Sequence, residues 1–110
     1  MGKYQMTFND FQRAASLTAR ENPFKERILV QSLGLAGEAG EVANLVKKWA
    51  WHNGPLSPDQ MADELADVLW YVADLASAMG LDLEAVALGN VEKLQRRYPA
   101  GFTADGGIRT

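Results

Sequence analysis

The chain has 110 residues with a formal net charge of −3, and 47% of its residues are hydrophobic while none is cysteine. This length is enough for one hydrophobic core, so we expect a single domain over residues 1–110 that folds without disulfides. The acidic balance argues against a nucleic-acid polymer as a partner. The longest apolar runs fall far short of the ~20 residues of a membrane span, so we expect a cytoplasmic protein without a membrane partner.

Helical spacing of apolar residues dominates the first half of the chain. A helix is predicted to open at Thr7, with Asp10 completing a weak capping box, and to end near residues 21–23. Apolar residues spaced three and four apart then predict a long second helix over residues 24–51. The turn sequence at residues 53–55, Asn-Gly-Pro, ends it.

Two further helices complete the expected fold. Ser57 is a good N-cap for a helix over residues 58–79, and Gly80 is suited to the position after its end. A fourth helix is predicted over residues 82–98. Residues 101–110 are polar and rich in glycine, which predicts a loosely held tail or an arm that packs on a partner subunit. The predicted fold class is all-α, a four-helix bundle.

Carboxylates occur where a helix core is expected. At 100° per residue, Glu38 projects from the apolar stripe of the second helix, and Glu41 lies at the edge of that stripe. On the third helix, Glu64, Asp67 and Asp74 follow one another along one flank. A short loop would make these two helices antiparallel neighbours. We therefore expect four carboxylates to meet in a partly desolvated cleft: Glu38, Glu41, Glu64 and Asp67.

The repulsion within such a cluster indicates a cation. Two like charges ~4 Å apart repel by roughly 4 kcal/mol at an effective dielectric constant of 20, so four carboxylates must take up protons or bind counter-ions. Oxygen ligands alone favour Mg²⁺ or Mn²⁺ over zinc. The alternative interpretation is a solvated helix face with surface ion pairs, such as Glu41 with Lys48.

Basic and polar side chains follow at a helical spacing on the fourth helix. Asn90, Lys93 and Arg97 share one flank, and Lys48 lies beyond Glu41 on the second helix. Arginine and lysine beside a bound metal suit the oxygens of a polyphosphate. Solvated surface residues are the alternative interpretation for each of them.

The two acidic motifs resemble a known signature. Glu38-Ala39-Gly40-Glu41, followed after 22 residues by Glu64-Leu65-Ala66-Asp67, is similar to the ExxE…ExxD pattern of the all-α nucleoside triphosphate pyrophosphohydrolases, the MazG-like superfamily. The segments LGLAGEAGEVANLVKKW, ELADVLWYVADLA and NVEKLQRRYPAGF also resemble successive blocks of short MazG-like proteins. The resemblance covers roughly residues 4–103.

The resemblance implies a reaction and a set of site residues. The reaction is hydrolysis of the α–β phosphoanhydride of a (deoxy)nucleoside triphosphate, giving the monophosphate and pyrophosphate. The implied ligands of Mg²⁺, or of Mn²⁺ in its place, are Glu38, Glu41, Glu64 and Asp67. One carboxylate would act instead as general base, with Glu41 preferred and Glu38 as the other catalytic candidate. The candidate substrate-binding residues are Asn90, Lys93, Arg97, Tyr71, Lys48 and Gln12.

Assembly and two competing functions complete the expectations. Apolar surface left exposed by four short helices predicts a homo-oligomer, and the resemblance implies a dimer or tetramer with sites between subunits. Glycines on the second helix, Gly34 among them, are expected to allow close helix packing. A di-iron helical bundle is disfavoured because no histidine lies three residues after any glutamate. A helical module that binds nucleotide or metal without catalysis is the other alternative.

Overall fold

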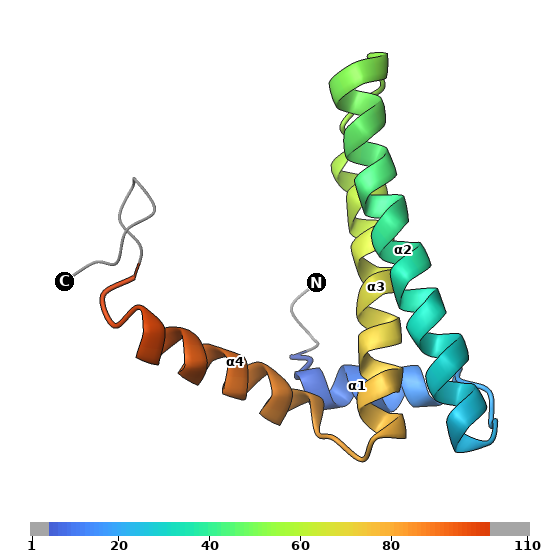
Figure 1. Ribbon diagram of the computed structural model, residues 1–110, viewed down its shortest axis with the longest axis vertical. Coiled ribbons are helices and arrows are strands. Elements are labelled where there is room, and N and C mark those ends of the chain that lie inside the picture. The colour runs from blue at the N-terminus through green and yellow to red at the C-terminus, as the bar shows by residue number, and fades with distance from the viewer. Residues whose placement is uncertain (1–4, 102–110) are drawn as a thin grey trace.

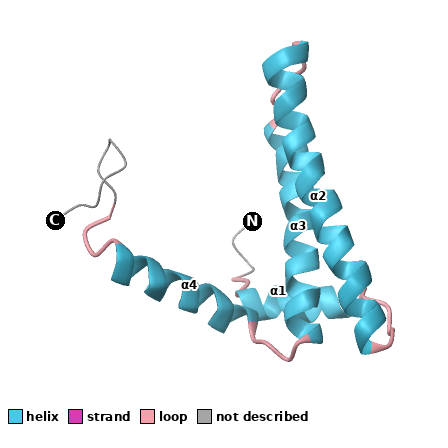
Figure 2. Cartoon of the chain, viewed as in Figure 1, coloured by secondary structure: helices cyan, strands magenta, loops and turns pink. Residues whose placement is uncertain are grey.

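The computed structural model describes residues 5–101, and this part of the chain consists of helices joined by loops, without a strand (Figures 1 and 2). The elements are α1 (Phe8–Ser16), α2 (Phe24–His52), α3 (Pro58–Ala78) and α4 (Leu83–Arg97). The expected all-α class is confirmed. In the described part of the chain, no helix combines the length and apolar character that crossing a membrane requires. Residues 102–110 of the expected tail lie outside the described residues.

Side-chain caps begin three of the helices as predicted. The Thr7 hydroxyl accepts the backbone N–H of Asp10 at 3.0 Å, and the Asp10 carboxylate accepts the backbone N–H of Thr7 at 3.0 Å, which completes the capping box. Ser57 and Asp82 likewise accept a backbone N–H from the first turn of α3 and α4, at 3.3 and 3.1 Å. These local bonds satisfy N–H groups that have no partner inside a helix.

The end of α1 differs from the prediction. The helix stops at Ser16, several residues before the expected end at residues 21–23. A tertiary contact lies at this point: the Thr18 hydroxyl donates to the carbonyl of Ala15 at 2.9 Å and accepts the indole N–H of Trp70, on α3, at 2.9 Å. A bond to a residue 52 positions away leaves no local signal, so the sequence alone could not place this helix end.

The helices α2 and α3 form a long antiparallel hairpin, and α1 crosses the base of α3 (Figure 1). The fully buried apolar side chains lie where α1, α3 and the start of α4 meet, and they are Ala15, Ala73, Ala76 and Leu83. Phe11, Trp70 and Val72 pack around them. No residue of α2 is fully buried. The hairpin therefore keeps much of its apolar surface in contact with solvent.

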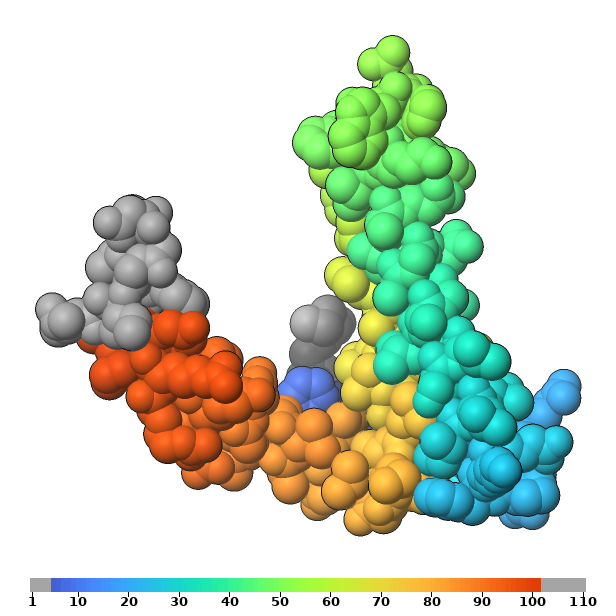
Figure 3. Space-filling view, viewed as in Figure 1, coloured from blue at the N-terminus to red at the C-terminus, as the bar shows by residue number. Residues whose placement is uncertain are grey.

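The expected four-helix bundle is not closed within one chain. Among the described residues, α4 contacts α1 and α3 but not α2, and it extends away from the base of the hairpin (Figure 1). Its apolar residues remain largely exposed, including Leu88 at 58%. The space-filling view shows the resulting open outline (Figure 3). Four helices are present as predicted, but among the described residues α1 and α3 cover only the start of α4, so the bundle is open at this helix.

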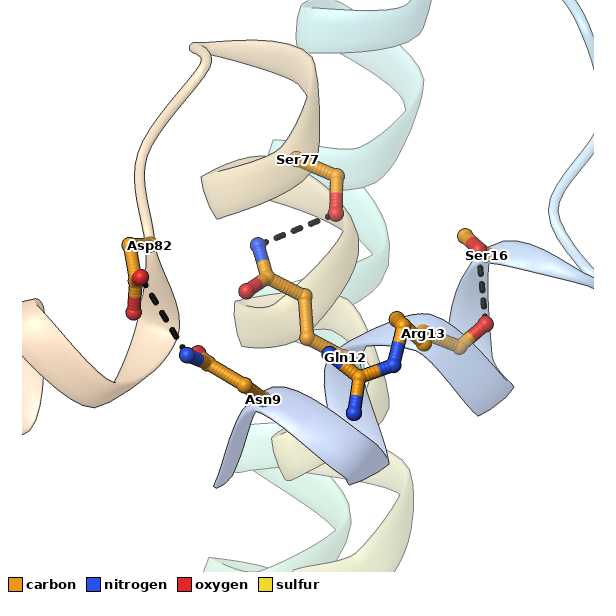
Figure 4. A pocket seen from close by; sticks show the side chains of 6 residues that line it. All are labelled: Asn9, Gln12, Arg13, Ser16, Ser77 and Asp82. Carbon is orange, nitrogen blue, oxygen red and sulfur yellow. Dashed lines mark hydrogen bonds between the residues drawn. The ribbon is translucent and has the colours of Figure 1, made fainter. Parts of the chain in front are cut away.

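Polar side chains of α1 hold the start of α4 in place. The Gln12 amide donates to the Leu81 carbonyl at 2.8 Å and to the Ser77 hydroxyl at 3.1 Å, and its oxygen accepts the backbone N–H of Leu83 at 2.9 Å. Asn9 donates to the Asp82 carboxylate at 3.2 Å (Figure 4). These directional bonds set the course of α4 away from the hairpin.

Candidate metal centre

Carboxylates from two helices meet midway along the α2–α3 hairpin. Glu38 from α2 and Glu64 and Asp67 from α3 each present a carboxylate oxygen within 4.8 Å of the others. Glu38 and Glu64 are half-buried, and Asp67 is exposed. Three carboxylates at this spacing provide the hard oxygen ligands that Mg²⁺ and Mn²⁺ prefer. The three carboxylates therefore fit a divalent cation. Three protein oxygens do not fill the coordination shell of Mg²⁺ or Mn²⁺, so water or a substrate oxygen could supply the other ligands.

Helical spacing accounts for this convergence. Glu64 and Asp67 are three residues apart, so they lie on the same face of α3 and point toward α2. Glu38 opposes them because the connection over residues 53–57 returns the chain antiparallel to α2. Each acidic motif thus contributes at least one carboxylate to the group of three, and all three lie on helices.

The electrostatics of the cluster are unfavourable for a charged Glu64. Partial burial raises the pKa of the Glu64 carboxyl above its usual value, and nearby carboxylates raise it further: Glu38, Glu41 and Asp67. Burial and like charge both disfavour the ionised form. A bound divalent cation would reverse this balance by offsetting the negative charge, so proton and metal would compete for the same carboxylate.

Glu41 has a different position from the other three acids. It is exposed and lies outside the group whose oxygens approach within 4.8 Å, although its charge acts on Glu64. It lies almost one turn beyond Glu38 on α2. The geometry separates Glu41 from the three clustered carboxylates, a distinction that the repeated ExxE and ExxD spacing does not reveal.

The predicted substrate-binding residues of α4 do not reach this cluster within one chain. Asn90, Lys93 and Arg97 are exposed on α4, which makes no contact with α2 in the described residues. Asn90 and Lys93 instead line a hollow of about 560 Å³ between α4, α1 and α3. Lys48 is exposed on α2, two turns beyond Glu41. The structure therefore unites three acids and leaves these basic residues apart from them.

Gln12 lies on α1, where each end of its amide is already hydrogen-bonded to the α3–α4 turn or to α4. Its neighbours Asn9, Arg13 and Ser16 line a polar hollow of about 260 Å³ there (Figure 4). This position gives Gln12 a structural role at the base of α4.

A cleft lined in part by Tyr71 lies nearer the base of the hairpin than the acidic cluster. Tyr71 lies one turn after Asp67, and the cleft of about 410 Å³ extends from its ring toward the α1–α2 loop. Trp70 packs edge-on against Tyr71, with ring centroids 4.9 Å apart. Polar and charged residues line the rest of the cleft, among them Arg20, Asn22 and Gln31. Apart from Tyr71, the sequence interpretation missed these residues because they come from separate segments without a shared motif.

Asp74 does not continue the acidic row, contrary to the expectation for that flank. It is fully buried and pairs with the guanidinium of Arg27 on α2, whose Nε lies 3.2 Å from Oδ2. The Gln31 amide also donates to Oδ2 at 2.8 Å. These hydrogen bonds, the one from Arg27 above all, hold the pKa of Asp74 below its usual value. Asp74 therefore links α3 to α2 through a buried ion pair with Arg27.

Comparison with known proteins identifies the family. A family model described as the MazG nucleotide pyrophosphohydrolase domain matches residues 29–102. The chain belongs to this family. Both acidic motifs of the MazG domain fall within the matched residues, as do Tyr71 and the predicted α4 residues. Family membership confirms the resemblance to MazG-like proteins and supports nucleotide pyrophosphohydrolase activity.

The chain is also similar to two curated proteins. It is 40% identical over 80 residues to the Gene 37 protein of Mycobacterium phage L5, covering 69% of this chain and 70% of the relative. It is 35% identical over 102 residues to dCTP pyrophosphatase 1 of Homo sapiens, covering 86% of this chain but 60% of the human protein. No solved structure matches the chain significantly.

Proposed function

We propose that the MazG domain hydrolyses the α–β phosphoanhydride of a (deoxy)nucleoside triphosphate with Mg²⁺ or Mn²⁺, releasing the monophosphate and pyrophosphate. The observation that carries this proposal is the convergence of Glu38, Glu64 and Asp67, from the two acidic motifs, within 4.8 Å. The relationship to a dCTP pyrophosphatase supports a deoxynucleoside triphosphate as substrate. A module that binds nucleotide without cleaving it is the alternative.

The acids have distinct proposed roles. Glu38, Glu64 and Asp67 hold the metal, and Glu41 either completes the ligand set or removes a proton from the attacking water. The exposed position of Glu41 outside the group of three favours the second role. When bound, the metal supplies positive charge to the triphosphate and lowers the pKa of a coordinated water.

The aromatic cleft is the proposed place for the nucleoside. It begins one turn from Asp67, so a nucleotide whose phosphates lie at the acids would extend its base toward Tyr71 and Trp70. Aromatic rings offer a stacking surface to any base. Polar groups such as the Gln31 amide would then add hydrogen bonds that discriminate between bases.

A second copy of the chain is proposed to complete the site. The chain exposes 8461 Å², against about 6000 Å² expected for a compact protein of its mass. Its radius of gyration is 17.1 Å, where about 13 Å is expected. The excess of exposed surface area is of the size that obligate dimers bury at their interface. Assembly as a dimer or tetramer would cover the apolar face of α4 and bring Asn90, Lys93 and Arg97 toward a neighbour's acids.

Pyrophosphate release from a panel of nucleotides tests the reaction. We expect release from at least one (deoxy)nucleoside triphosphate when Mg²⁺ or Mn²⁺ is present, and none after chelation by EDTA. The panel includes dCTP, dUTP, the four ribonucleotides and oxidised purine nucleotides. Products are separated by anion exchange, so that pyrophosphate is distinguished from orthophosphate. Nucleotide binding without release of either product would favour the binding-module alternative.

Mixing two inactive variants tests the shared site. We expect Glu38→Gln and Lys93→Ala each to be inactive alone, and their mixture to recover up to about a quarter of wild-type activity after subunit exchange. In a mixed dimer, one site then carries both changes and the other carries neither. Native mass spectrometry confirms that mixed oligomers form. Mixed oligomers without recovered activity, or a monomer at micromolar concentration in sedimentation, would contradict a site built from two subunits.

A further inference from the structure

We propose that the contact between Gly34 and Tyr71 sets the register of α2 against α3, and that this register brings Glu38 to Glu64 and Asp67. Gly34 and Tyr71 are thus positioning residues for the metal centre. This inference rests on the proposed metal site, but the contact itself can be tested without a metal.

Gly34 faces the ring of Tyr71 with no room for a side chain. A Cβ atom at Gly34 would lie 2.3 Å from Cε1 and 2.5 Å from Cζ of Tyr71, far inside van der Waals contact. The same addition at Gly37 or Gly40, on the same helix, would meet nothing within 4 Å. The requirement for glycine in this stretch of α2 is therefore confined to Gly34 among these three positions.

Trp70 braces the ring of Tyr71 on one side, and the cleft lies along another part of the ring. Trp70 packs edge-on against the ring, and the Trp70 indole is itself bonded to the Thr18 hydroxyl at 2.9 Å. A methyl group at Gly34 would therefore move either the ring into the cleft or α2 along or away from α3, and only the second movement changes the register.

The contact lies one turn from the acids on both helices. Glu38 is four residues after Gly34, and Asp67 is four residues before Tyr71. Because α2 and α3 are antiparallel, Glu38 and Asp67 are displaced from Gly34 and Tyr71 in the same direction along the hairpin. The Gly34–Tyr71 pair and the acidic residues therefore form successive layers, and a slip of one helix would shift both layers together. A slip of one residue moves a helix by about 1.5 Å and turns each side chain by about 100°. Such a change would separate the carboxylates that now approach within 4.8 Å.

A third layer follows the same pairing. Gln31 lies three residues before Gly34, and Asp74 lies three residues after Tyr71. Their side chains are joined by the 2.8 Å hydrogen bond to Oδ2 of Asp74. The layers Gln31–Asp74 and Gly34–Tyr71 thus precede the acidic layer, and both restrict the sliding of the two helices before any cation binds.

The test compares Gly34→Ala with Gly37→Ala in the full chain. Mn²⁺ binding is measured from the electron paramagnetic resonance signal of the free ion, and thermal unfolding is followed by circular dichroism in EDTA. We expect Gly34→Ala to weaken Mn²⁺ binding about tenfold or more and to lower Tm. The control Gly37→Ala should bind Mn²⁺ like the wild type and keep or raise Tm, because alanine favours the helix.

A second variant separates a steric contact from general damage. The double variant Gly34→Ala/Tyr71→Ala removes the ring that the new methyl group would meet. Once the ring is absent, the methyl group should have no further effect, so we expect the double variant to match Tyr71→Ala in Mn²⁺ affinity and to be no lower in Tm. Wild-type Mn²⁺ affinity in Gly34→Ala, or a double variant that binds Mn²⁺ more weakly than Tyr71→Ala, would overturn the proposal. If the wild type bound no Mn²⁺, the proposed metal site would fail, and the unfolding measurements in EDTA would still decide whether the contact sets the register.

Discussion

Replacing Glu38 by glutamine is expected to lower metal-dependent pyrophosphate release by about 100-fold or more. Glutamine keeps the size of the side chain but removes a negative charge from the three clustered carboxylates. Glu38 is half-buried and is the member of that group from α2. Its loss therefore leaves a ligand pair from α3 alone. The rate is measured with the best nucleotide of the panel, and Mn²⁺ affinity is measured on the same samples.

A matched control distinguishes loss of the site from loss of charge in general. Asp63 is exposed on α3 and lies outside the cluster. Asp63→Asn removes the same charge as Glu38→Gln, one residue from Glu64. Because Asp63 is not one of the three clustered carboxylates, we expect this variant to retain wild-type turnover and Mn²⁺ affinity. Near-wild-type turnover in Glu38→Gln, with the protein folded, would refute a metal-binding role for Glu38.

The same assay separates the two proposed roles of Glu41. If Glu41 is the general base, Glu41→Gln loses turnover while Mn²⁺ affinity stays close to that of the wild type. If Glu41 is a ligand, affinity falls together with turnover, as for Glu38→Gln. Its exposed position outside the group of three favours the first result. Retention of turnover in Glu41→Gln would exclude both roles.

Asp74→Ala is expected to lower the free energy of unfolding by about 3 kcal/mol, because it leaves the Arg27 guanidinium without its partner. The Asp74 side chain is fully buried, whereas that of Arg27 is one-quarter exposed. Solvent at Arg27 keeps the expected loss at the lower end of the range for a broken buried ion pair. Urea unfolding in EDTA measures this loss without any contribution from metal binding.

The stabilisation by the Asp74–Arg27 ion pair depends on pH in one direction. Hydrogen bonds from Arg27, and then from Gln31, hold the pKa of Asp74 below the usual 3.8. The resulting stabilisation is therefore fully present above about pH 3.8 and is lost as the pH falls through the lowered pKa of the folded state. The difference in stability between wild type and Asp74→Asn should narrow below pH 3.8. An equal difference at pH 3 and pH 7, or a loss no larger than that of Asp63→Asn, would contradict a stabilising charged pair.

Local chemistry made much of the fold predictable. Thr7, Ser57 and Asp82 cap helices through bonds to residues three positions away, and Gly80 adopts the left-handed conformation, with φ of 69°, that ends α3. The acidic residues of the candidate site could be predicted for a similar reason. Helical periodicity places Glu38 within an apolar stripe, where an unpaired charge is costly.

Long-range contacts explain what could not be predicted. Asp74 belongs by spacing to the acidic flank of α3, and only the opposing Arg27 and Gln31 of α2 give it a different role. In the same way, α1 ends early at a bond to Trp70, and hydrogen bonds from Asn9 and Gln12 direct α4 away from the hairpin. These partners are between 43 and 73 residues apart, too far for periodicity to relate them.

The sequence by itself determined the helical class, the helix caps and the acidic residues of the candidate metal centre, because each depends on neighbours within one or two turns. The tertiary structure alone decided which acids converge, that Glu41 lies outside the group of three, and that α4 leaves its apolar face uncovered. Those properties depend on the register and direction of helices. Register and direction follow from side chains that meet across the fold, such as Gly34 with Tyr71 and Asp74 with Arg27.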